Sequence, residues 1–176
     1  MADVTALIER WVRPIPDWPV PGVTFRDITP PLGQPEAFAS VIDALAAVGD
    51  ELGPVDAVLG IEARGFIVGA PVALKLDAGF VPVRKPGKLP SETLSASYTL
   101  EYGEAIVEIH ADALKPGDRV LVVDDLLATG GTLEAAAALV EQAGATVAGH
   151  VVAIELPALG GRSRLGDVPL RSLATF

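Results

Sequence analysis

Short apolar runs and amphipathic stretches alternate along most of the chain. Runs rich in Val, Ile and Leu are typical of strands buried in a parallel sheet. They occupy residues 55–61, 79–83, 119–123 and 146–154. Stretches with apolar side chains at helical spacing predict helices over residues 2–11, 36–51, 65–76 and 132–143. Strands that alternate with helices predict an α/β fold with a doubly wound, mostly parallel sheet.

Three segments do not follow this alternation. Residues 14–35 hold seven of the 15 prolines, so we expect them to be extended or turning and not helical. The apolar side chains among these prolines indicate a packed segment and not a linker. Two alternating stretches, 96–100 and 105–109, predict a β-hairpin, which follows a flexible loop over residues 84–95. Residues 156–176 predict a short helix and a candidate last strand.

Length and composition narrow the classes of protein to consider. With 176 residues, the chain has the size of one domain. Its longest nearly uncharged stretch, residues 65–74, is about half of the roughly 20 residues that span a bilayer. The net charge of −10 argues against nucleic acid as a partner, because nucleic-acid binding draws on a basic surface. Without cysteine or a signal-peptide core, the sequence predicts a cytoplasmic protein with no membrane partner.

The segment 120–132 carries the strongest chemical signal. An apolar strand ends in two acids, Asp124 and Asp125, and a loop ending in Thr-Gly-Gly-Thr leads into a helix. Backbone N–H groups at such a helix start can hold a phosphate. The two acids can accept hydrogen bonds from hydroxyl groups or hold a hydrated metal. The pattern therefore suits a phosphorylated ribose, and the alternative is an ordinary strand-to-helix turn with solvated acids.

Two further segments carry cations. Arg64, in the Gly-flanked segment 60–66 at a predicted helix start, could hold a second phosphate group, or it could be an ordinary surface residue. The segment 84–90 is a basic loop that could equally be a solvated turn. No Walker A loop and no Gly-x-Gly-x-x-Gly fingerprint occurs, which argues against ATP or NAD as the ligand. His110 and His150 lie in apolar strand-like settings, and we interpret both as structural.

Five segments together resemble one enzyme family. Segment 123–132 is similar to the phosphoribosyl-pyrophosphate (PRPP) motif of type I phosphoribosyltransferases. With it, the segments 23–32, 62–66, 84–90 and 98–103 resemble the adenine phosphoribosyltransferase family in order and spacing. The resemblance implies the type I phosphoribosyltransferase fold, with a small N-terminal base-binding hood over residues 1–34 and a flexible loop and hairpin over residues 84–110. It also implies a homodimer that converts adenine and PRPP to AMP and pyrophosphate with Mg²⁺, in purine salvage.

The resemblance also implies roles for individual residues. Phe25 would stack on adenine, and the backbone of Val23 and Arg26 would read its edge. Glu101, on the hairpin, would handle a purine-ring proton. Asp124 and Asp125 would bind the ribose hydroxyls near the Mg²⁺ that PRPP carries. The 5′-phosphate would be bound by Ala128, Thr129, Gly130, Gly131 and Thr132. The pyrophosphate site, in part across the dimer, would be formed by Glu62, Ala63, Arg64, Arg84, Lys85 and Lys88.

Two other functions have to be weighed. One is a phosphoribosyltransferase for another base, such as xanthine, hypoxanthine or guanine, and segments 23–28 and 100–103 argue against it by resemblance. The other is a regulatory protein that senses PRPP and binds nucleic acid. It would need a basic face or an added helix-turn-helix module, whereas this chain has a pI of about 4.5.

Overall fold

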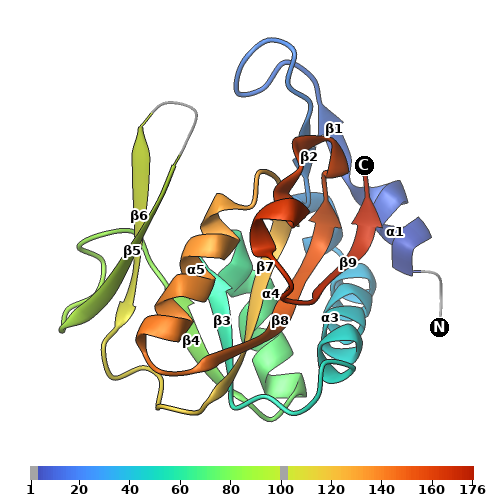
Figure 1. The fold of residues 1–176 in the computed structure, drawn as a ribbon. Helices are drawn as coiled ribbons and strands as arrows, with labels where there is room; N and C mark the ends of the chain where they lie inside the picture. Colours follow the sequence, from blue (N-terminus) through green and yellow to red (C-terminus); the bar gives the residue numbers. More distant parts are fainter. Residues whose placement is uncertain (1–3, 100–102) are drawn as a thin grey trace.

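In a computed structural model, residues 4–99 and 103–176 are described. Their centre is a five-stranded sheet in the order β4-β3-β7-β8-β9, and every neighbouring pair in it is parallel (Figure 1). Its strands are β3 (Ala57–Ile61), β4 (Gly79–Val83), β7 (Arg119–Leu127), β8 (Thr146–Glu155) and β9 (Leu170–Thr175). The predicted α/β fold with a doubly wound parallel sheet is confirmed.

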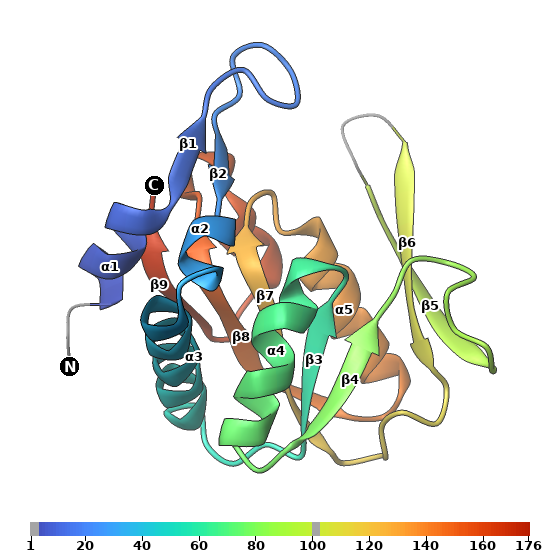
Figure 2. The same ribbon diagram turned by 180° about the vertical axis from the view of Figure 1, so that it is seen from behind.

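Helices cover both faces of this sheet. Helix α5 (Gly131–Gln142) lies on one face, and α3 (Pro35–Asp50) and α4 (Arg64–Lys75) lie on the other, as the two opposite views show (Figures 1 and 2). Helix α1 (Val4–Trp11) packs beside β9 and α3. Two apolar cores result, one under α5 and one under α3 and α4, and the strands between them are buried. Continuous apolar strands are what such two-sided burial requires.

The strand order reverses between β3 and β7. From β3 the chain crosses through α4 to β4 on one side, and from β7 it crosses through α5 to β8 on the other. The loops at the carboxyl ends of these two strands therefore diverge and leave a crevice, which is the usual ligand position in open α/β sheets.

Two antiparallel pairs stand apart from the sheet. Strands β1 (Arg13–Ile15) and β2 (Phe25–Asp27) pair below the loop that projects at the top of Figure 1. Strands β5 (Thr93–Thr99) and β6 (Glu104–His110) form the predicted hairpin on the other side. The hairpin begins at Thr93, so the predicted loop over 84–95 is three residues shorter at its end. The turn from 100 to 102, with Glu101, lies outside the described residues.

Two predictions about local structure are wrong. Residues Thr29–Leu32 form a short helix, α2, inside the proline-rich segment. Pro30 and Pro31 are tolerated because the first turn of a helix needs no N–H donors there. Strand β7 runs to Leu127, so Asp124 and Asp125 lie within it and do not follow it. Pairing with β3 ends at Val123, however, and beyond this residue β7 continues alongside β8.

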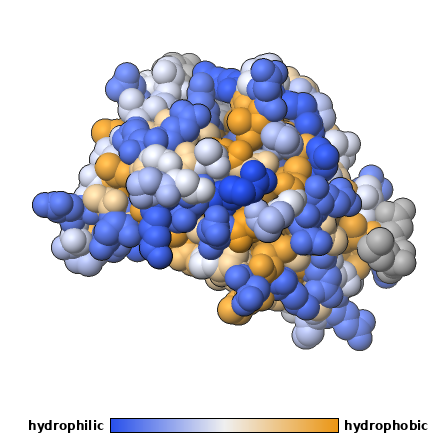
Figure 3. Space-filling view, turned by 60° about the horizontal axis from the view of Figure 1, so that its bottom comes forward, coloured by the Kyte–Doolittle hydropathy of each residue, from blue (hydrophilic) through white to orange (hydrophobic). Residues whose placement is uncertain are grey.

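The C-terminal segment has two short 3₁₀ helices, η1 (Pro157–Leu159) and η2 (Gly161–Leu165), before β9, which agrees with the predicted helix and last strand. On the face seen in Figure 3, hydrophobic residues form patches between hydrophilic ones. Within the described residues, no helix is long and apolar enough to cross a membrane.

Candidate active site

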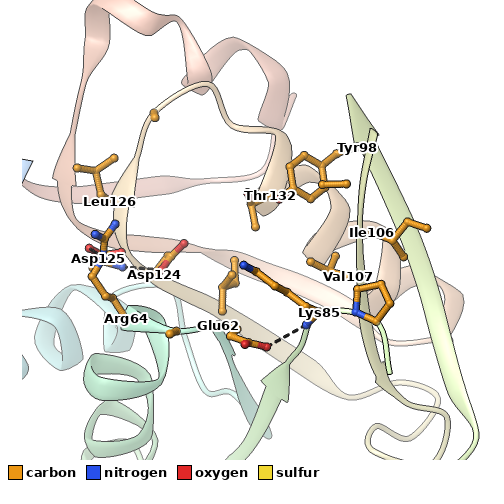
Figure 4. A pocket seen from close by; sticks show the side chains of 15 residues that line it. Glu62, Arg64, Lys85, Tyr98, Ile106, Val107, Asp124, Asp125, Leu126 and Thr132 are labelled. Atoms are coloured by element: carbon orange, nitrogen blue, oxygen red, sulfur yellow. Dashed lines mark hydrogen bonds and ion pairs between the residues drawn. The ribbon is translucent and has the colours of Figure 1, made fainter. Parts of the chain in front are cut away.

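A cleft of about 740 Å³ opens at the carboxyl ends of β3 and β7 (Figure 4). Its walls come from the β3–α4 turn, the segment after β4, the hairpin, and the end of β7 with the start of α5. The cleft is lined by Ile61, Glu62, Ala63, Arg64, Lys85, Pro86, Tyr98, Ala105, Ile106, Val107, Asp124, Asp125, Leu126, Ala128 and Thr132. The fold thus brings together predicted site residues that are more than 60 positions apart in the sequence.

Asp124 and Asp125 stand at the centre of this cleft. Asp125 is buried, and Asp124 is half-buried. Burial raises the pKa of Asp124 well above its usual value, and the neighbouring Asp125 carboxylate raises it further. Burial also raises the pKa of Asp125, although the Arg64 guanidinium acts in the opposite direction. A cation or hydroxyl donors placed against this pair would relieve the repulsion between the two carboxylates.

Arg64, at the start of α4, is the cation closest to this pair. Its Nε lies 2.6 Å from Oδ2 of Asp125. Within the described part of the chain, that oxygen accepts no hydrogen bond of good geometry, so the Arg64 charge is what compensates for its burial. The close approach of α4 depends on Gly65, where a Cβ would lie 2.8 Å from Oδ1 of Asp124.

The loop between β7 and α5 forms a second, smaller hollow of about 80 Å³ that shares Asp124, Ala128 and Thr132 with the cleft. Gly130 has a left-handed backbone (φ 85°) and caps α5, and the first-turn N–H groups of α5 have no carbonyl of their own helix to bind. These donors and the positive end of the helix dipole make the hollow suited to an anion.

The other predicted pyrophosphate residues divide into two groups. Lys85 lines the cleft, whereas Arg84 and Lys88 do not. Oε2 of Glu62 accepts hydrogen bonds from Nε of Arg84 at 2.9 Å and from the backbone N–H of Lys85 at 3.0 Å. These bonds, the Lys85 N–H first and Arg84 next, lower the pKa of Glu62. Glu62 therefore holds the start of the basic loop in place, and Arg84 lies over the Phe66 ring.

The predicted base-binding residues come from the β1–β2 segment, next to the cleft. Phe25 is half-buried, and its ring packs against Trp18 in a T-shaped arrangement and against the guanidinium of Arg64. Val23 is exposed, and Arg26 lies over the ring of Phe176. Phe25 does not line the cleft itself, and Arg64 is the side chain that joins the two.

The donor chemistry of the acid pair fits a hard divalent cation. Mg²⁺ prefers carboxylate oxygens and substrate phosphates, and it commonly takes only one or two carboxylates from the protein. Asp124 and Asp125 offer such oxygens, and one of them lacks a well-formed hydrogen bond. No group of three or more His, Asp or Glu side chains able to hold a metal occurs in the described ranges 4–99 and 103–176. With two carboxylate side chains, Asp124 and Asp125 suit a cation that also binds the phosphates of a ligand.

Comparisons with known proteins agree with this geometry. Residues 32–173 match the phosphoribosyl transferase domain family. The chain is 61% identical over 175 residues to adenine phosphoribosyltransferase from Thermobifida fusca, with 98% of each chain covered. It superposes with a TM-score of 0.93 on the crystal structure of adenine phosphoribosyltransferase from Thermoanaerobacter pseudethanolicus, at 50% identity and with 98% and 99% of the two chains covered.

A third relative was solved with ligands. The Saccharomyces cerevisiae adenine phosphoribosyltransferase, complexed with an imino-altritol bisphosphate and adenine, gives a TM-score of 0.94 at 39% identity, with 98% and 99% of the chains covered. The chain belongs to the adenine phosphoribosyltransferase family.

Within this family member, sequence reasoning missed several residues of the cleft. Tyr98, Ile106 and Val107 form its hairpin wall (Figure 4). A Cβ on Gly131 would lie 2.9 Å from the Tyr98 ring, so the hairpin rests on the start of α5. Tyr98 opens the motif 98–103, but alternation along a hairpin shows only which side chains share a face. It does not show that the face turns toward the start of α5 and the loop between β7 and α5.

Proposed function

We propose that the protein transfers the 5-phosphoribosyl group from PRPP to adenine and so produces AMP and pyrophosphate in purine salvage. The observation that carries the proposal is the acid pair Asp124–Asp125 beside the Gly130–Thr132 helix start, at the point where the sheet order reverses. An anion site next to two diol-binding carboxylates is what a ribose 5-phosphate requires. The identity with the Thermobifida fusca enzyme supports adenine as the base.

In the proposed reaction, a ring nitrogen of adenine forms a bond to C1′ of the ribose while the bond from C1′ to pyrophosphate breaks. The 5′-phosphate would bind the loop from Ala128 to Thr132, and the ribose hydroxyls would donate to Asp124 and Asp125. Negative charge grows on the leaving pyrophosphate, so cations held in advance near it stabilise the transition state. We assign this role to Arg64 and Lys85, which line the cleft, with Ala63 beside them.

We propose a less direct role in pyrophosphate binding for Arg84, Lys88 and Glu62. Arg84 is held by Glu62, and Lys88 is exposed in the loop after β4. Either cation would have to change position to reach a pyrophosphate in the same cleft, or would act at the partner's cleft in a dimer. Glu62 itself is an acceptor and would serve by holding the basic loop.

We propose Mg²⁺ as the cofactor, carried by PRPP and bound near Asp124 and Asp125. When bound, it would neutralise charge on the pyrophosphate oxygens. Burial raises the pKa of Asp124, and the neighbouring Asp125 carboxylate raises it further, so a cation placed against the pair would offset both effects.

For the base, we propose stacking on Phe25, with edge recognition by the backbone of Val23 and Arg26. Stacking is tolerant of base identity, so the choice of adenine must come from hydrogen bonds to its edge. Glu101 is proposed to accept or return the proton of the purine ring. It lies in the sequence between β5 and β6, and the hairpin wall of the cleft brings those strands to the site.

We further propose a homodimer. Helix α4 exposes Ile67 and Leu74, which are two turns apart and 45% and 84% exposed. An apolar strip of this kind is costly in water and is suited to a self-complementary contact. Light scattering at micromolar concentration should give twice the mass of 18.1 kDa, and a value near 18.1 kDa would contradict the dimer. The cytoplasmic location predicted from the sequence accords with a phosphorylated, charged substrate.

In the direct test, the protein is incubated with PRPP, Mg²⁺ and one base at a time: adenine, hypoxanthine, guanine, xanthine or orotate. Chromatography would then follow the nucleotide formed. Adenine should be converted to AMP far faster than any 6-oxopurine, because a wrong base leaves a buried donor or acceptor unpaired, a cost of about 1–3 kcal/mol. Equal turnover of hypoxanthine would favour a phosphoribosyltransferase of broader or different base choice.

A further inference from the structure

Arg64 connects the two halves of the proposed substrate site. Its Nε lies 2.6 Å from Oδ2 of Asp125, and its Cζ lies over the Phe25 ring, 5.3 Å from the centroid. Figure 4 shows the Arg64 side chain beside Asp125. Arg64 lines the cleft and Phe25 does not. The guanidinium therefore covers the Phe25 face that would otherwise look into the cleft.

The Phe25 ring already contacts other side chains. Besides Arg64, the indole of Trp18 packs against it in a T-shaped arrangement, with centroids 4.5 Å apart and an angle of 68° between the planes. A purine that enters from the cleft and stacks on Phe25 needs the space that the Arg64 guanidinium takes. Either the guanidinium leaves or the base does not stack.

The ion pair with Asp125 holds Arg64 in this place. The Asp125 side chain is 4% exposed and the Arg64 side chain 38% exposed, so the pair is shielded on the acid side. The stacking contact of a guanidinium on an aromatic ring adds a second attraction. Both would weaken when PRPP binds, because ribose hydroxyls would take over Asp125 and an anionic pyrophosphate would attract Arg64.

We infer that Arg64 is a positioning residue that couples the two substrate sites of the proposed reaction. In the substrate-free protein it occupies the adenine-stacking face of Phe25. PRPP draws it away and so opens this face to the base. The inference rests on the proposed function, and it gives Arg64 a task in base binding beyond contact with pyrophosphate. Because coupling between two sites is reciprocal, adenine and PRPP should each raise the affinity for the other.

Removing the guanidinium should then move the two affinities in opposite directions. In Arg64→Gln, adenine alone should bind more tightly than in the parent protein, by roughly twofold to thirtyfold, since it no longer displaces a cation–π contact. PRPP with Mg²⁺ should bind more weakly. Arg64→Lys keeps a charge for Asp125 but stacks less well, so its adenine affinity should lie between the two.

Arg84→Gln is the matched control. Arg84 also pairs with a carboxylate, Glu62 at 2.9 Å, and also lies over a phenylalanine ring, Phe66 at 5.7 Å. It does not line the cleft and does not touch Phe25. Its replacement should leave the affinity for adenine alone unchanged.

The experiment is calorimetric titration of each purified protein with adenine alone and, separately, with PRPP and Mg²⁺, after thermal unfolding has shown that the variants fold. Tighter adenine binding by Arg64→Gln, or by Arg64→Lys if the Gln variant does not fold, supports the inference. Adenine affinity that is unchanged, weaker or still unmeasurable in the folded variant overturns it. If the parent forms no AMP from adenine and PRPP, the proposed function fails. If it forms AMP but the variant shows no gain, only the coupling role fails.

Discussion

Glu155 and Arg162 form a two-pronged ion pair at the end of β8. Nε of Arg162 donates to Oε1 of Glu155 at 2.9 Å, and Nη2 donates to Oε2. Ser172, on β9, donates to the same carboxylate at 2.9 Å. Glu155 is buried, and the hydrogen bonds from Arg162 lower its pKa. This pair fastens the 3₁₀ turn η2 to the sheet, and η2 in turn packs against the loop 128–130, which is the proposed phosphate loop.

Arg162→Gln should therefore destabilise the fold. It leaves a buried carboxylate with only Ser172 and the remaining amide as donors, and because Arg162 is 55% exposed we expect a moderate loss of about 1–3 kcal/mol in the free energy of unfolding. Urea unfolding at pH 7 measures it. Arg171→Gln is the control, since Arg171 is similarly exposed and lies 4.0 Å from Glu51, and it should change the free energy by under about 0.5 kcal/mol. Equal effects of the two changes would contradict the assignment.

Gly161 should tolerate no side chain. A Cβ at this position would collide with the carbonyl oxygen of Ala128 and would lie 2.9 Å from the Gly130 nitrogen, both of them backbone atoms of the phosphate loop. Gly161→Ala should thus lower the melting temperature and also weaken AMP binding, because the loop must shift. Gly33→Ala serves as the control, with its nearest atom at 3.5 Å and an ordinary backbone φ of −79°. A Gly161→Ala protein with parental melting temperature and AMP affinity would show that the contact is not restrictive.

His150 should make the protein sensitive to mild acid. It is fully buried in β8, and burial lowers its pKa from 6.5 to about 4. The folded state thus prefers the neutral imidazole. The contribution of His150 to the free energy of unfolding is therefore fully present above pH 6.5, and about 3 kcal/mol is lost as the pH falls from 6.5 toward 4. Urea unfolding of the parent and of His150→Leu at pH 7 and pH 4.5 checks this. The variant should lose less stability over this interval, and equal losses would rule His150 out as the cause.

The main strands of the parallel sheet and the position of the acid pair before a helix start can be predicted from the sequence, because both depend on local patterns. Apolar runs identify buried strands, and Asp124 and Asp125 stand beside a glycine-rich helix start whatever the rest of the chain does. The extension of β7 to Leu127 cannot be predicted in this way, because it depends on pairing with β8 beyond the point where pairing with β3 ends. A strand that keeps one neighbour after losing the other needs no change in its own pattern.

Contacts between segments that are distant in the sequence cannot be predicted from local patterns either. The sequence places both Arg64 and Arg84 directly after predicted strands, and the resemblance implies pyrophosphate binding for both. Only the packing shows that Arg64 lies between Asp125 and Phe25 and that Arg84 turns to Phe66. Likewise, no local pattern near Arg162 indicates that η2 packs against the proposed phosphate loop.

Glu101→Gln tests the proposed proton transfer. The amide keeps the size and most hydrogen bonding of the carboxylate but cannot accept the purine proton, a step worth typically 10²–10⁴-fold in rate. The rate of AMP formation should fall by that order, while the affinity for PRPP with Mg²⁺ hardly changes. Glu104→Gln, on the neighbouring exposed strand end, is the control and should keep the parental rate. A Glu101→Gln protein that turns over adenine at the parental rate would remove Glu101 from the mechanism.

Asp124→Asn should weaken the binding of PRPP without lowering the stability of the fold. If Asp124 accepts hydrogen bonds from the ribose, its loss should weaken the binding of PRPP with Mg²⁺ by roughly tenfold to more than a hundredfold, the range for a hydrogen bond to a charged group. Adenine alone should bind as before, because the base is proposed to stack at Phe25. The fold should not suffer, since burial and the adjacent Asp125 charge already disfavour an ionised Asp124. Calorimetry and thermal unfolding of one preparation give both results. Unchanged PRPP affinity would mean that the acid pair does not bind the sugar, and a lower melting temperature would mean that the charge at Asp124 stabilises the fold.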